Sequence, residues 1–160
     1  MCSRMGVVDG FAISYWVVTK KINSWRCNML EGRCLCGDVR YKYDGELTEV
    51  AICHCSQCRQ AQGTPFATNA PVDTDKLHFL NGETSLKSYF SSKEKRRVFC
   101  KNCGSPIFSQ RVDMPEVVRL RLGTLTSVVH HTPDYHIYYG SKVDWFDGTG
   151  QIPMHDENKD

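Results

Sequence analysis

Seven cysteines of this chain fall into three tight clusters, and their spacing constrains the fold more than any other feature. The clusters are Cys34/Cys36, Cys53/Cys55/Cys58 and Cys100/Cys103. Thiolates one or two residues apart can converge on one soft cation, and such a sulfur site indicates zinc. Seven ligands divide into a closed four-cysteine site and a three-cysteine site with one position left for water or substrate. We therefore predict two Zn²⁺ ions per chain.

A disulfide framework is the main alternative use for so many cysteines. It requires a secretory signal and usually an even number of cysteines, whereas this chain has nine. The apolar run 10–18 follows Asp9, precedes Lys20 and is shorter than the ~20 residues that span a bilayer. We therefore expect a reducing compartment such as the cytoplasm, metal-bound thiolates and no membrane contact.

Length and composition are those of one globular domain. The chain has 160 residues, of which 41% are hydrophobic and 24% charged. Patterning begins at Met29, so we expect an N-terminal extension over 1–28, a folded domain over 29–153 and a polar tail over 154–160. A formal net charge of +2 does not predict nucleic acid as a partner. The basic run 93–97 (KEKRR) is expected to be a solvated loop, with a phosphate or carboxylate contact as the alternative.

Short strands dominate the pattern from Gly37 onward. Apolar and polar residues alternate over 38–43 and 117–122, which predicts half-buried strands. Further strands are expected at 66–70, 77–80, 85–90, 97–99, 107–111 and 135–139. No stretch of about 12 residues or more carries a helical period. The pattern therefore predicts an all-β fold.

Turn residues predict how some of these segments connect. Asp44-Gly45 is a hairpin signal, so 49–53 is the expected return strand. Asn81-Gly82 predicts a second turn. The segment 56–62 can form one or two helical turns that Gly63 would close.

The sequence Cys100-Lys-Asn-Cys103-Gly104 has the form of a zinc knuckle, in which two thiolates bracket a tight turn and a glycine supplies the positive φ. Cys34 and Cys36 are its natural partners, because residues two apart on an extended segment share a face. Together these cysteines would close a tetrahedral site, and the domain would fold with its metal.

In the remaining cluster, Cys53 and Cys55 share a face and Cys58 returns over the following turn. His54 alternates to the other side, so we expect a structural histidine rather than a fourth ligand. Arg59 adds positive potential, which lowers thiolate pKa and favours anions. The alternative is a structural site whose fourth ligand comes from elsewhere in the fold.

Two other uses of the cysteines stay open on spacing alone. Cys55/Cys58 with Cys100/Cys103 would form a ribbon-type site, although the gap of 41 residues exceeds the 15–20 typical of such sites. Iron–sulfur ligation is chemically possible, but no ferredoxin spacing is present.

Several blocks follow one another in a distinctive order between about Leu30 and Pro153. They are 32–41 (GRCLCGDVRY), 53–59 (CHCSQCR), Gly63, 99–105 (FCKNCGS), 123–125 (GTL), 133–136 (PDYH) and Trp145. In order and spacing they resemble the glutathione-dependent formaldehyde-activating family, also called the centromere protein V domain. The resemblance implies a zinc-stapled, Mss4-like β-tent of several short, coiled antiparallel sheets.

The resemblance also implies an activity. It assigns a structural zinc to Cys34, Cys36, Cys100 and Cys103, and a catalytic zinc to Cys53, Cys55 and Cys58. The implied enzyme is a carbon–sulfur lyase like S-(hydroxymethyl)glutathione synthase, with glutathione and a small aldehyde as partners. Arg59 would contact a glutathione carboxylate. For His136 and Tyr138 we expect packing in the core rather than acid–base chemistry. The alternative function is a non-catalytic, zinc-stabilised module that recruits a protein.

Overall fold

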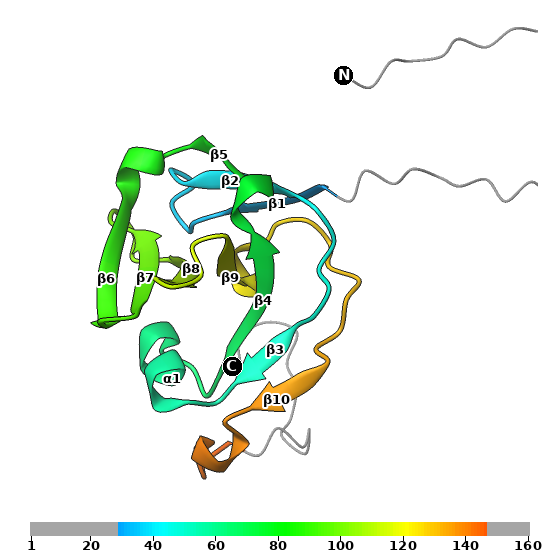
Figure 1. Ribbon diagram of the computed structural model, residues 1–160, viewed down its shortest axis with the longest axis vertical. Helices are drawn as coiled ribbons and strands as arrows, with labels where there is room; N and C mark the ends of the chain where they lie inside the picture. Colours follow the sequence, from blue (N-terminus) through cyan, green and yellow to red (C-terminus); the bar gives the residue numbers. More distant parts are fainter. Residues whose placement is uncertain (1–28, 147–160) are drawn as a thin grey trace, which may run out of the picture.

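The structure, a computed structural model, describes residues 29–146 and contains two β-sheets (Figure 1). In spatial order, the smaller sheet consists of β1 (Met29–Arg33), β2 (Arg40–Asp44) and β5 (Leu77–Asn81). The larger consists of β10 (Tyr135–Ile137), β3 (Ala51–Cys53), β4 (Ala67–Asp73), β9 (Val117–Arg121), β8 (Pro106–Arg111), β7 (Lys95–Cys100) and β6 (Leu86–Ser92). The expected extension and tail, 1–28 and 154–160, lie outside the described residues.

The prediction of an all-β fold is confirmed. One short α-helix, α1 (Ser56–Gln62), and four single-turn 3₁₀ helices accompany the strands of residues 29–146. Strand neighbours are antiparallel except β10 and β3, which run parallel. None of the helices in this part of the chain is long and apolar enough to cross a membrane.

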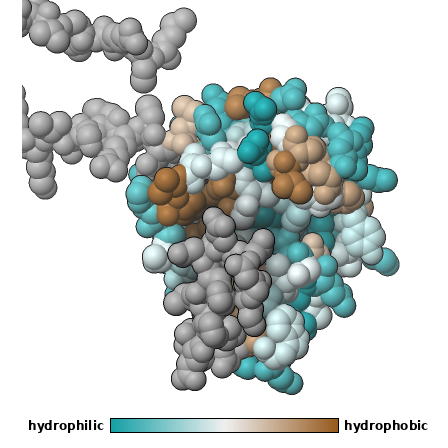
Figure 2. All heavy atoms as spheres, turned by 180° about the vertical axis from the view of Figure 1, so that it is seen from behind, coloured by the Kyte–Doolittle hydropathy of each residue, from teal (hydrophilic) through white to brown (hydrophobic). Residues whose placement is uncertain are grey.

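The core lies between the two sheets. Tyr41 and Tyr43 project from β2 and are almost fully buried, as their alternation predicted. They share one cluster with Val98, Val118 and Leu120 from the inner face of the larger sheet. The other face of the larger sheet is therefore free to carry polar groups. On the molecular face in Figure 2, hydrophobic side chains form separate patches among hydrophilic ones.

The hairpin predicted at Asp44-Gly45 is wrong. β2 pairs with β1 and β5, whereas β3 belongs to the other sheet. The intervening segment crosses between the sheets and is held by other contacts: Leu47 packs on the core, and the Val50 amide donates to Asp134 Oδ2 at 2.7 Å. A turn-forming dipeptide does not reveal that the chain changes sheets after it.

The expectation that the basic run 93–97 is a solvated loop is also wrong in part. Its last three residues form the start of β7, and Arg97 is only 9% exposed. Its first two residues form the exposed turn after β6. The buried part points a basic side chain into the protein, which requires a compensating group or ligand.

Gly82 makes the turn after β5 in a conformation that other residues rarely adopt, with φ 73°. A β-carbon there would collide with the carbonyl oxygen of Asp38. We expect Gly82→Ala to lower the free energy of unfolding by about 2–4 kcal/mol, because strain and collision add. Urea denaturation measures this, and Gly123→Ala, where the added methyl meets open space, is the control. Equal stability of both variants would contradict the assignment of a backbone collision.

Candidate metal centres

The first cysteine group is assembled from two turns far apart in sequence. The Sγ atoms of its four members lie within 4.8 Å of one another; they are Cys34, Cys36, Cys100 and Cys103, the four-cysteine cluster. The expectation of an extended segment at Cys34 is wrong, because both pairs lie in turns that a left-handed glycine closes. Gly37 (φ 78°) donates to the Cys34 carbonyl at 3.0 Å, and Gly104 (φ 76°) donates to the Cys100 carbonyl at 2.8 Å.

Backbone and hydroxyl groups surround the sulfurs of the four-cysteine cluster. The Val39 amide donates to Cys34 Sγ at 3.3 Å, and the Ser105 hydroxyl lies 3.3 Å from Cys103 Sγ. This contact with Ser105, helped by backbone donors, lowers the pKa of the Cys103 thiol to about 5. The cluster joins the β1–β2 connection to the β7–β8 connection, so an ion there would tie the two sheets together.

The second group consists of Cys53, Cys55 and Cys58, the three-cysteine cluster, whose Sγ atoms also lie within 4.8 Å of one another. Cys53 ends β3, Cys55 is the N-cap of α1, and Cys58 lies in its first turn. The Cys58 amide donates to Cys55 Sγ at 3.4 Å, and Gly63 closes the helix at φ 65°, as the sequence predicted. Short local structure therefore fixes the three sulfurs relative to one another.

His54 lies beside the three-cysteine cluster but is not part of it. It is buried, and its Nε2 shares a hydrogen bond of 2.8 Å with Nδ1 of His136. Burial, together with the neighbouring His136, lowers the pKa of His54 and favours the neutral ring. This agrees with the expected structural role. His136 and Tyr138, which we expected in the core, are instead exposed.

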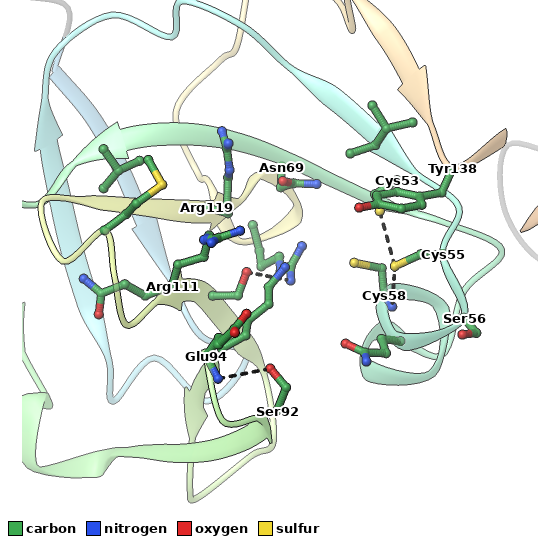
Figure 3. A pocket seen from close by; sticks show the side chains of 18 residues that line it. Cys53, Cys55, Ser56, Cys58, Asn69, Ser92, Glu94, Arg111, Arg119 and Tyr138 are labelled. Carbon is green, nitrogen blue, oxygen red and sulfur yellow. Dashed lines mark hydrogen bonds between the residues drawn. The ribbon is translucent and has the colours of Figure 1, made fainter.

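A cavity of about 520 Å³ opens onto the three-cysteine cluster. Figure 3 shows the three sulfurs at one end, with the ring of Tyr138 beside Cys53. Tyr138 is the one non-glycine residue of 29–146 with a positive φ (53°). Such a backbone conformation costs free energy and recurs where a side chain must be held at a site.

The other side of this cavity is mainly basic, with one carboxylate, Glu94, among the lining residues (Figure 3). Its cationic lining residues are Lys95, Arg111, Arg119 and Arg121, from the adjacent strands β7, β8 and β9. Arg59, the expected anion contact, is not among the lining residues, and its Nε donates to the His54 carbonyl at 3.1 Å. The charge at this site therefore comes from the sheet rather than from α1.

The cationic residues that line the cavity, the basic wall, influence the ionisation of the three-cysteine cluster. Burial opposes ionisation of Cys58, but the Arg121 guanidinium and hydrogen bonds from the other two thiols outweigh it, so the pKa of Cys58 is lowered. Burial raises the pKa of Cys53 to about 12. Three neighbouring thiols therefore do not ionise together without a cation among them.

Both clusters have the dimensions of metal sites. Sulfurs of a tetrahedral site with bonds of about 2.3 Å lie roughly 3.8 Å apart. Cys34 Sγ lies 3.4 Å from Cys36 Sγ, and Cys53 Sγ lies 3.5 Å from Cys55 Sγ. All seven of these cysteines are free of disulfides. Each cluster could therefore hold a soft metal ion, and the disulfide framework does not apply to the cysteines of residues 29–146.

The model of the glutathione-dependent formaldehyde-activating enzyme family matches residues 29–141. The chain belongs to this family. The match includes both cysteine clusters, the basic wall and Tyr138, so the site just described lies within the family's domain.

One relative by sequence and one solved structure support the assignment. An uncharacterized lyase of Schizosaccharomyces pombe is 27% identical over 124 residues, covering 78% of this chain and 88% of the relative. A solved structure of a Rhodobacter sphaeroides protein is 27% identical with a TM-score of 0.52, covering 66% of this chain and 98% of the other. A lyase-like activity within this family is therefore supported.

Sequence reasoning missed the residues of the cavity other than its cysteines. Arg119 and Arg121 alternate with apolar residues in VVRLRL, a pattern from which we predicted only a half-buried strand. Lys95 lies in the run expected to be solvated. The available signal was that three neighbouring strands each place cations on the same face, which only the strand order makes visible.

Proposed function

We propose that this chain is a zinc-dependent carbon–sulfur lyase that makes and breaks the bond between a thiol such as glutathione and a small aldehyde. The four-cysteine cluster would hold a structural zinc and the three-cysteine cluster a catalytic zinc. The free thiols and the family's chemistry both suit a reducing compartment such as the cytoplasm.

The observation that carries this proposal is the position of the three-cysteine cluster at the end of a cavity of about 520 Å³. None of the four-cysteine cluster lines that cavity. Structural zinc sites are closed, whereas catalytic sites keep a position for water or substrate. The four-cysteine cluster therefore fits a structural site, and the three-cysteine cluster fits a catalytic one.

A closed structural site at the three-cysteine cluster finds no support in residues 29–146. No further cysteine, histidine or carboxylate of this part joins the group. His54 is nearest in sequence, but its Nε2 is engaged by His136. The vacant coordination position would therefore face the cavity rather than another side chain.

Zinc bound to three thiolates would lower the pKa of an incoming thiol and supply a thiolate near neutral pH. The cysteines fix where that sulfur lies, and the cavity holds the aldehyde beside it. The thiolate sulfur attacks the carbonyl carbon, a carbon–sulfur bond forms, and the π pair moves to oxygen, which takes a proton. The reverse reaction returns the proton and expels the thiolate, so no oxidant or reductant is needed.

Tyr138 is our candidate for the group that moves this proton. Its phenol belongs to the cavity lining next to Cys53. We expect Tyr138→Phe to slow the reaction by at least about tenfold while thiol affinity stays within twofold, because a positioned proton donor acts on the transition state. Steady-state kinetics measures both. A variant with parent kcat would remove Tyr138 from the mechanism.

Exchange NMR with ¹³C-formaldehyde and glutathione tests the activity itself. The uncatalysed reaction is the baseline, and the zinc-loaded chain should accelerate interconversion of free and sulfur-bound carbon. An unchanged exchange rate at micromolar protein, with two zinc ions bound per chain, would refute the proposed function and leave the binding-module alternative.

A further inference from the structure

Two cations near the cavity, one half-buried and one buried, form no ion pair with a carboxylate of residues 29–146. They are Lys95 and Arg97, which lie two residues apart on β7 and therefore on the same face. Lys95 lines the cavity, and Arg97 pairs across the sheet with Ser109, which also lines it. No ion pair joins either cation to a described carboxylate.

The guanidinium of Arg97 is only partly satisfied. Its Nη2 donates to Oε1 of Gln57 at 3.3 Å, and its buried Nη1 has no hydrogen-bond partner. Gln57 is exposed, lines the cavity and belongs to α1. A neutral amide oxygen at this length is a weak acceptor for a buried cation, whereas a carboxylate can accept two bonds from a guanidinium. Because Gln57 is exposed, a ligand carboxylate can displace its side chain from Arg97.

The other basic residues of the cavity already have partners. Arg111 is paired with Asp113 at 2.5 Å, and Arg119 with Glu49 at 3.3 Å. Arg121 contacts the Cys58 sulfur and donates to Ser109 Oγ at 3.3 Å. Three thiolates and a divalent ion would carry one net negative charge. Arg121, Arg97 and Lys95 all lie near Cys58, so three positive charges face one negative charge and two remain unbalanced.

We propose that Lys95 and Arg97 form a carboxylate-binding subsite in the wall of the cavity, entered by displacing the side chain of Gln57. The subsite takes a carboxylate of a ligand whose reacting atom lies at the three-cysteine cluster. The proposed subsite rests on the proposed function only in placing the reacting atom of the ligand at the three-cysteine cluster. The carboxylate can belong to the thiol or to the aldehyde, and the chemistry of recognition is the same.

Binding to the zinc-loaded chain tests the subsite with probes that separate the two sources. For the thiol, the probes are S-methylglutathione, which keeps both carboxylates but has no ionisable sulfur, and glutathione diethyl ester, which has neither carboxylate free. For the aldehyde they are glyoxylate and the neutral glycolaldehyde. Calorimetry on the parent chain, Lys95→Met and Arg97→Met gives the dissociation constants.

We expect both variants to bind at least one carboxylate probe about tenfold or more weakly, because each loses a charge-assisted hydrogen bond. The dissociation constant of the matching probe without a free carboxylate should change by less than twofold. Lys95→Arg should restore binding. Arg111→Met is the matched control, because this lining cation is already paired with Asp113, and its effect should stay below threefold.

The subsite is refuted if folded Lys95→Met binds both carboxylate probes as the parent does, or if neither probe binds the parent at millimolar concentration. Equal losses of affinity for the probes without a free carboxylate also refute it, because Lys95 would then act through the three-cysteine cluster or the fold. If Arg97→Met fails to fold, the dissociation constants of Lys95→Met alone test the subsite. S-methylglutathione cannot offer a thiolate, so its result stands even if the exchange NMR experiment finds no catalysis.

Discussion

Replacing Cys103 by serine is expected to unfold the domain. Cys103 is one of four sulfurs that bring the β1–β2 and β7–β8 connections together, and no disulfide replaces them. Structural zinc contributes roughly 10–16 kcal/mol of apparent binding free energy, comparable to the roughly 5–15 kcal/mol that keeps a whole domain folded. Loss of one ligand should therefore remove the cooperative thermal transition or lower Tm by more than about 15 °C.

Circular dichroism and a count of zinc per chain measure this effect. Ser105→Ala is the local control, because it removes the hydroxyl contact to Cys103 but keeps all four sulfurs. It should lower stability by no more than about 1–2 kcal/mol. A Cys103→Ser protein that melts like the parent would mean that the four-cysteine cluster does not hold a structural metal.

Replacing Cys55 by serine should have the opposite outcome: lost activity with the fold retained. Cys55 supplies one of only three sulfurs at the proposed catalytic zinc, so we expect the exchange rate to fall by at least about a hundredfold. Cys55 is also the N-cap of α1 and accepts a hydrogen bond from the Cys58 amide. A serine hydroxyl can take over this cap, so Tm should change by less than about 5 °C.

Cys55→Ala separates the two roles of this residue. It should be as inactive as the serine variant but less stable by about 1 kcal/mol, because alanine cannot cap the helix. The zinc content should fall from two ions to about one in both variants. Full activity in Cys55→Ser with two ions bound would exclude the three-cysteine cluster from catalysis.

Local signals in the sequence predicted much of this molecule. The alternation that buries Tyr41 and Tyr43, and the capped turn 56–62 with Gly63, depend on neighbours a few residues away and were confirmed. The sulfurs also lie in the groups of four and three that the spacing favoured and the family resemblance assigned. A knuckle is a local motif, so its sequence carries most of its geometry.

Features that depend on distant pairing could not be predicted. β3 leaves β2 for the other sheet, where the Val50 amide donates to Asp134, a residue far away in sequence. The basic wall exists because β7, β8 and β9 are adjacent and place Lys95, Arg111 and Arg119 on one face. In sequence the same residues resemble ordinary solvated charges, since charge alone does not tell which side of a strand faces a cavity.

X-ray absorption at the zinc edge, with and without glutathione, tests the central claim most directly. Seven cysteine sulfurs shared by two ions give about 3.5 sulfurs per zinc, and a thiolate entering the vacant position raises this to about 4. The account predicts that rise when glutathione is added and none with S-methylglutathione. A sulfur count that glutathione leaves unchanged would contradict it.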